Sequence, residues 1–301
     1  MIIVFVIAVS VGWRNPGKKP AIPVRGVWFV KQRIISGAVI VLFAAAIVLF
    51  NQSFPVALNI AIALISGCAI WELIAALGIQ KKLFLVWPSL AAAVVIPFTS
   101  YMGCDAGLIL YIYTLILFCG LLFHHKEVTF RELGMIYSMT LLIPAALGSL
   151  VGIRDQNPAC GIFTVMIAVF AAWIADAGAY FVGSFFGKTK LCPEISPKKT
   201  VEGAIGGMVV NMLVLVLIGW IYELLFPADV NYISMLLIGF GSSVISILGD
   251  LSFSLIKRSC NIKDFGQVIP GHGGILDRFD SVIFVSPLIY YICLWLPLAV
   301  K

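Results

Sequence analysis

Long apolar runs alternate with shorter polar connections along most of the chain. A helix that crosses a bilayer needs about 20 mainly apolar residues. Nine segments approach that length: 34–51, 55–77, 83–99, 106–123, 133–152, 160–182, 204–226, 231–256 and 281–299. The pattern therefore predicts an all-α, polytopic helical bundle in a membrane, with about nine transmembrane helices.

The first residues do not fit this pattern. Residues 2–12 are apolar but too short to span, and they lack the basic start of a signal peptide. We expect residues 1–30 to form an extension that is interfacial or that precedes the natural start of the chain.

The composition agrees with a membrane protein. Apolar residues make up 61% of the chain and charged residues 11%, against about a quarter charged in soluble domains. Such a chain cannot cover a soluble surface with polar groups, and it is too apolar to be disordered. It has no basic block with interleaved aromatic residues, so nothing indicates nucleic acid as a partner. The seven scattered cysteines are expected to be small buried apolar side chains.

The basic residues indicate the orientation. Of the 20 Lys and Arg residues, all except Arg154 and Lys301 lie before the first predicted span or in the even-numbered connections. Because positive charge collects on the cytoplasmic side of membrane proteins, the N-terminus and these connections are predicted to be cytoplasmic. Two cytoplasmic connections, 183–203 and 257–280, are long enough to suggest function. We therefore divide the chain into about five helices over 31–160 and a catalytic region over 161–301.

Acidic residues gather in the second region. Asp176 and Asp250 lie inside predicted spans, each seven residues before the inner end, or about 10 Å deep. An acid within a bilayer is unfavourable by roughly 2.5–3.5 kcal/mol, so both should face a polar cavity or a partner. The alternative for either is a structural hydrogen bond to a neighbouring helix. A third intramembrane acid, Glu72, is expected to be structural.

Further polar residues flank the second long connection. Ser246, Asp250, Ser254 and Lys257 share one helix face by their spacing. Asp277 and Asp280 lie three residues apart in the first turn of the last helix, where simple capping is the alternative role. A glycine-rich turn over 270–274 precedes them and can bring backbone amides close to the acids.

These residue types indicate a chemistry. Carboxylates without His or Cys partners suit a hard cation such as Mg²⁺, which also binds waters and phosphates. Charge for binding phosphate is available on the same membrane side from Lys198, Lys199, Lys257, Arg258, Lys263 and Arg278. Acids, magnesium and lysines together are typical of phosphoryl or nucleotidyl transfer. The membrane location indicates a lipid phosphate as one substrate.

The motifs resemble those of a known family. The segments are SLIKR at 254–258, KDFG at 263–266 and PGHGGILDRFD at 270–280, with DAGAY at 176–180, ISPKKTVEG at 195–203 and Gly249-Asp250 upstream. Together they are similar to the signature of phosphatidate cytidylyltransferases, also called CDP-diacylglycerol synthases. The resemblance is close over about 170–290 and loose over 31–170, and the extension 1–30 departs from it.

The resemblance implies transfer of CMP from CTP to phosphatidic acid, giving CDP-diacylglycerol and pyrophosphate. It implies Mg²⁺ held by Asp250 and Asp277, with a second metal ion left open. The expected catalytic residues are Asp250, Asp277, Asp280, Lys257 and Arg258. The residues expected to bind CTP or lipid phosphate are Lys198, Lys199, Thr200, Lys263, Asp264, His272, Arg278 and Asp176.

The same resemblance implies a multi-pass protein of the cell (plasma or inner) membrane with its active site on the cytoplasmic side, and it leaves a homodimer open. Two other classes stay open as well. One is a related cytidylyltransferase or kinase that acts on another lipid. The other is an ion-coupled transporter, which predicts inverted repeats and acids at both membrane faces; the sequence shows no repeat.

Overall fold

The computed structural model describes residues 53–266 and 273–300. The predicted extension 1–30, the predicted span 34–51 and His272 therefore lie outside the described residues. Within the described ranges, eight helical segments are long and apolar enough to cross a membrane, and they match the remaining eight predicted spans. The protein is thus a polytopic helical membrane protein. The helices are α3 (Ala57–Leu77), α4 (Leu83–Val95), α6 (Ala106–Phe123), α7 (Phe130–Gln156), α8 (Gly161–Phe186), α9 (Val201–Leu225), α10 (Tyr232–Ser259) and α11 (Leu276–Trp295).

The second of these segments is interrupted near its end. After α4 the chain forms a short 3₁₀ turn, η1 (Ile96–Phe98), and a last helical turn, α5 (Thr99–Met102). Pro97 lies in this turn and has no backbone N–H to continue the α-helical pattern. Gly103 then ends the span with φ +63°, a left-handed conformation that glycine adopts without steric penalty.

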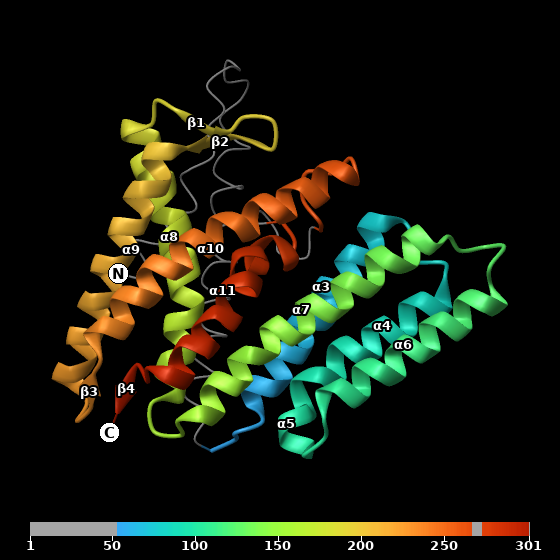
Figure 1. Cartoon of the computed structure of the whole chain (residues 1–301), viewed down its shortest axis with the longest axis horizontal. Coiled ribbons are helices and arrows are strands. Elements are labelled where there is room, and N and C mark those ends of the chain that lie inside the picture. The colour runs from blue at the N-terminus through green and yellow to red at the C-terminus, as the bar shows by residue number, and fades with distance from the viewer. Residues whose placement is uncertain (1–52, 267–272, 301) are drawn as a thin grey trace, which may run out of the picture.

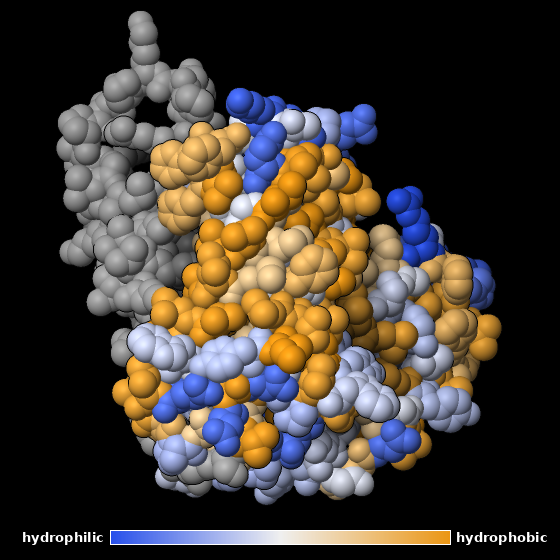
Figure 2. Space-filling model, turned by 60° about the vertical axis from the view of Figure 1, so that its left-hand side comes forward, coloured by the Kyte–Doolittle hydropathy of each residue, from blue (hydrophilic) through white to orange (hydrophobic). Residues whose placement is uncertain are grey.

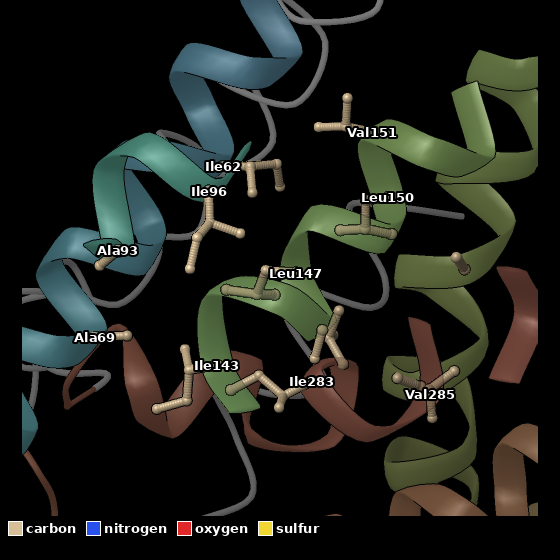
Figure 3. Packing of buried hydrophobic residues seen from close by; sticks show 14 of the residues in the cluster. Ile62, Ala69, Ala93, Ile96, Ile143, Leu147, Leu150, Val151, Ile283 and Val285 are labelled. Carbon is tan, nitrogen blue, oxygen red and sulfur yellow. The ribbon is translucent and has the colours of Figure 1, made fainter. Parts of the chain in front are cut away.

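The helices form two groups that meet at the centre of the molecule. Figure 1 shows α3, α4, α6 and α7 together, with α8, α9 and α10 on the other side and α11 between the two groups. Helix α11 packs on α7 and α10. Figure 3 shows buried aliphatic side chains of the first group and of α11, among them Ile62, Ala93, Ile143, Leu147, Ile283 and Val285. The contact of α11 with α3 and α7 is therefore mainly apolar.

The outer surface is largely apolar, as expected of helices that face lipid. Large hydrophobic side chains such as Leu122 and Phe123 of α6 and Leu213 of α9 are more than half exposed. Figure 2 shows a broad hydrophobic area on one face, with hydrophilic residues gathered at its two ends. This arrangement suits a bilayer, in which exposed apolar side chains are well solvated.

The all-α prediction is confirmed, and two short antiparallel strand pairs accompany the helices. Strands β1 (Lys190–Cys192) and β2 (Ser196–Thr200) form a hairpin inside the predicted connection 183–203, and β3 (Asp229–Val230) pairs with β4 (Ala299–Val300). The two pairs lie at opposite ends of the molecule (Figure 1). The β1–β2 hairpin leads directly into α9 and so brings the lysines of β2 to the end of the α8–α9 pair.

Glycines allow α8 and α9 to approach each other closely. A Cβ atom added to Gly207 would lie 2.7 Å from the backbone nitrogen of Ala179 and 2.8 Å from the carbonyl oxygen of Ala175. A Cβ on Gly203 would lie 2.6 Å from the carbonyl oxygen of Ala179. Small residues at such contacts are typical of packed membrane helices. This contact fixes the position of Asp176, which lies on the same stretch of α8.

Candidate active site

Asp176 joins three helices. Its carboxylate accepts hydrogen bonds from the hydroxyl of Ser246 in α10, at 2.6 Å, and from that of Ser281 in α11, at 2.8 Å. These are the hydrogen bonds to neighbouring helices that the structural interpretation of this acid predicts. The same contacts also place Asp176 beside the helix faces that carry the other acids, so it belongs to one polar cluster with them.

Asp250 of α10 pairs with a lysine from the hairpin. The ammonium of Lys199 lies 2.6 Å from Asp250 Oδ2. The two groups form an ion pair but do not meet the geometric requirements of a hydrogen bond. Both side chains remain partly open to solvent, at 22% exposed for Lys199 and 30% for Asp250. The neighbouring Lys198 is exposed, as expected where successive strand residues face opposite sides. The two lysines predicted to act together thus differ in position.

Asp277 and Asp280 of α11 share the lysine of α10. The ammonium of Lys257 donates to Asp277 Oδ1 at 2.8 Å and lies 4.0 Å from Asp280 Oδ2. The three side chains are 3–11% exposed. Lys257 also lies 5.5 Å from the centre of the Phe265 ring, within the range of a cation–π interaction. The polar face of α10 predicted from sequence spacing therefore does contact the acids of α11.

Asp277 also forms hydrogen bonds to the backbone of the connection that precedes it. Its Oδ2 atom accepts hydrogen bonds from the backbone N–H groups of Phe265, at 2.8 Å, and Gly274, at 3.1 Å. Asp277 thus acts as a cap for local backbone and as an ion-pair partner at the same time. Its position depends directly on the conformation of the chain on both sides of residues 267–272.

The cluster concentrates charge. The carboxylates of Asp176 and Asp250 repel each other and both repel Asp280, while Lys257 attracts Asp280 and Lys199 attracts Asp176. Among the described residues, no group of three or more His, Cys, Asp or Glu side chains is arranged to hold a metal ion by itself. A metal bound here would complete its coordination with waters or phosphates, which is how Mg²⁺ usually binds.

The other predicted site residues lie around this cluster. Thr200 caps α9 by accepting from the N–H of Gly203 at 3.2 Å. Arg258 is exposed and donates to the carbonyl of Ile262 at 3.3 Å. Lys263 and Asp264 are exposed in the connection after α10. The Nε atom of Arg278, in the first turn of α11, is buried without a hydrogen-bond partner within the described ranges.

Three residues of this region make contacts that the sequence did not indicate, although a structural role was expected for Glu72. Ser281 donates a hydrogen bond to Asp176. Its position four residues after Asp277 puts it on the same helix face, and this spacing could have indicated it. Glu202 accepts from the backbone N–H groups of Lys188 and Thr189, both at 3.1 Å, and so fixes the start of the hairpin. Glu72 of α3 binds the start of α11. No local pattern could have indicated the last contact, because its partners are about 200 residues apart.

Comparisons with known proteins agree with this arrangement. Residues 31–296 match the cytidylyltransferase family. A phosphatidate cytidylyltransferase of Bacillus subtilis is 43% identical over 164 residues, 54% of this chain and 59% of the relative. One of Synechocystis sp. is 44% identical over 138 residues, 46% of this chain and 45% of the relative. One of Haemophilus influenzae is 36% identical over 162 residues, 53% and 56% of the two chains.

The chain therefore spans about half the length of the curated relatives that it matches. The family match, in contrast, covers every described helix, strands β1, β2 and β3, and every acid and lysine of the cluster. The resemblance seen in the motifs is thereby confirmed, and this chain belongs to the cytidylyltransferase family.

Proposed function

We propose that the protein is a phosphatidate cytidylyltransferase, which transfers CMP from CTP to phosphatidic acid and gives CDP-diacylglycerol and pyrophosphate. The observation that carries the proposal is the cluster itself. Carboxylates from α8, α10 and α11 meet two lysines, Lys199 and Lys257, in a membrane protein of the cytidylyltransferase family. The relatives that carry the name phosphatidate cytidylyltransferase support the choice of substrates.

The reaction needs charge neutralisation more than covalent help from the protein. An oxygen of the lipid phosphate attacks the α-phosphorus of CTP, and the bond from that phosphorus to the β-phosphate oxygen breaks. Pyrophosphate leaves with the electron pair. Both reactants are anionic, so positioned cations are the main requirement for catalysis.

The lysines are suited to this task. Lys199 comes from the hairpin and Lys257 from α10, and each already contacts a carboxylate of the cluster. A phosphate that enters between them gains two ammonium donors, each acting as a point charge. Four additional basic residues lie around the same cluster: Lys198, Arg258, Lys263 and Arg278. Of these, Arg278 has an Nε atom that is buried without a hydrogen-bond partner among the described residues.

The donor set fits Mg²⁺. The carboxylates of Asp250 and Asp277 are hard oxygen ligands, with Asp280 next to them, and Asp250 retains solvent exposure for water or phosphate ligands. When bound, the ion supplies charge neutralisation for the phosphates and polarises the α-phosphoryl group. Asp176, held by two serine hydroxyls, supports the helices that carry these ligands.

The site is proposed to open to the cytoplasm, where CTP is available. The predicted connections 183–203 and 257–280 carry eight of the basic residues that define the predicted cytoplasmic side. A protein with this orientation would reach phosphatidic acid in the inner leaflet of the cell membrane. The clustering of the intramembrane acids around one set of lysines favours this enzyme over an ion-coupled transporter.

The test is an assay of the purified chain in mixed micelles with labelled CTP, Mg²⁺ and a panel of lipids. We expect a CDP-lipid from phosphatidic acid and none from diacylglycerol. A product from diacylglycerol alone would support a lipid kinase instead. Removal of Mg²⁺ with EDTA should abolish the activity, and added Mg²⁺ should restore it.

A further inference from the structure

Glu72 lies outside the cluster but holds the start of the helix that carries Asp277 and Asp280. Its side chain comes from α3 and the residue is 2% exposed. Its Oε1 atom accepts a hydrogen bond from the backbone N–H of Ile275, and its Oε2 atom accepts one from Leu276, both at 2.9 Å. Helix α11 has no side-chain cap from its own N-cap residue. The cap is supplied instead by a helix of the other group.

The same carboxylate contacts the chain before and after residues 267–272. A Cβ atom added to Gly266 would lie 2.5 Å from Glu72 Oε1, and one added to Gly274 would clash with Oε2. Asp277 binds the same two segments from its own side, through the N–H groups of Phe265 and Gly274. Glu72 and Asp277 therefore both contact the two backbone segments that flank residues 267–272.

We propose that Glu72 is a positioning residue that fixes Asp277 relative to Lys257. The first N–H groups of a helix have no partner within the helix, and a negative charge beside them is favourable. Without the carboxylate, the first turn of α11 loses two charge-assisted hydrogen bonds, and the segment around Gly274 loses its packing partner. Asp277 would then be free to shift, since it depends on that segment for its own position.

The expected change in kcat rests on the proposed function, whereas the expected change in hydrogen exchange does not. The variant is Glu72→Gln, which keeps the size of the side chain but places an NH₂ group against a backbone N–H. The matched control is Glu132→Gln. Glu132 also caps a helix, α7, and pairs with Lys82 at 2.6 Å, but it lies away from the cluster.

For Glu72→Gln we expect kcat to fall at least about tenfold while KM for CTP changes less than about threefold, because a misplaced ligand acts mainly on the transition state. The control should stay within about twofold of wild type when kcat is expressed per folded protein in each sample. Hydrogen exchange at Ile275 and Leu276 should become faster in Glu72→Gln only.

Unchanged exchange at these two amides would overturn the proposal, and so would a loss of kcat that only follows a loss of folded protein. If Glu72→Gln does not fold, Glu72→Asp keeps the charge on a side chain shorter by one methylene and should show the same two effects in weaker form. A wild-type protein that makes no CDP-lipid would refute the proposed function, but the exchange measurement would still decide the role of Glu72.

Discussion

The two adjacent lysines of the hairpin should contribute very differently to activity. Lys199 lies 2.6 Å from Asp250, whereas Lys198 is exposed on β2. A hydrogen bond or ion pair to a charged group contributes about 1.5–3 kcal/mol when it is shielded from water. Both partners here are about a quarter exposed, so solvent screening favours the lower end of that range. Loss of about 1.5 kcal/mol of charge stabilisation from the transition state corresponds to about tenfold in rate.

We therefore expect Lys199→Ala to lower kcat/KM at least about tenfold, and more if the ammonium also binds a phosphate. Lys198→Ala should have a smaller effect, because Lys198 is exposed on β2 and Lys199 is the lysine that lies beside Asp250. Lys190→Ala is the matched control, since Lys190 is an exposed lysine of the same hairpin.

The assay is initial-rate formation of CDP-lipid at varied CTP, with folded protein quantified by size exclusion in detergent. Equal losses in Lys198→Ala and Lys199→Ala would refute the reasoning, because the geometry of β2 separates these two side chains. A loss in Lys190→Ala as large as in Lys199→Ala would show that the whole hairpin, and not the contact with Asp250, determines the rate.

The remaining predictions concern the metal, the packing and the orientation. Asp250→Asn and Asp277→Asn should each lower kcat by about two orders of magnitude, and the double variant should lose little more; near wild-type Mg²⁺-dependent activity in either would contradict a shared site. Gly207→Ala should lower the thermal midpoint, because the added methyl meets backbone of α8, whereas Gly134→Ala, with open space around it, should not; equal midpoints would contradict the close packing of α8 on α9. A cysteine placed at 228 should react with an impermeant reagent from outside the cell and one at 190 should not, and the reverse pattern would contradict the proposed orientation.

The helices were predictable because membrane thickness fixes their length. The predicted span 106–123 has the same bounds as α6. The predicted span 133–152 was too short at both ends, since α7 runs from Phe130 to Gln156 and includes charged residues. Thr129 and Glu132 form a capping box there, so backbone hydrogen bonding continues past the point where apolarity ends. At the C-terminus the prediction ran too far, because Pro297 follows the end of α11 and the next residues pair as β4.

The residue types of the site were predictable, but their pairing was not. Intramembrane acids and the spacing along α10 indicated a polar face. From that face Ser246 and Lys257 do contact other helices, and Asp250 contacts the β1–β2 hairpin. The choice of Lys199 over Lys198 as the partner of Asp250 depends on a strand that hydropathy does not reveal. The contact from Glu72 to α11 depends on the packing of two distant helices, which no local pattern contains.

The central claim is that this chain transfers the α-phosphoryl group of CTP, with its nucleoside, to a lipid phosphate. The most direct measurement uses two samples of CTP, one radiolabelled at the α-phosphorus and one at the γ-phosphorus, with phosphatidic acid and Mg²⁺. The account predicts label in the lipid fraction from the first sample and label in pyrophosphate from the second. Lipid labelled from the γ-phosphorus, or no labelled lipid from either sample with folded protein, would contradict it.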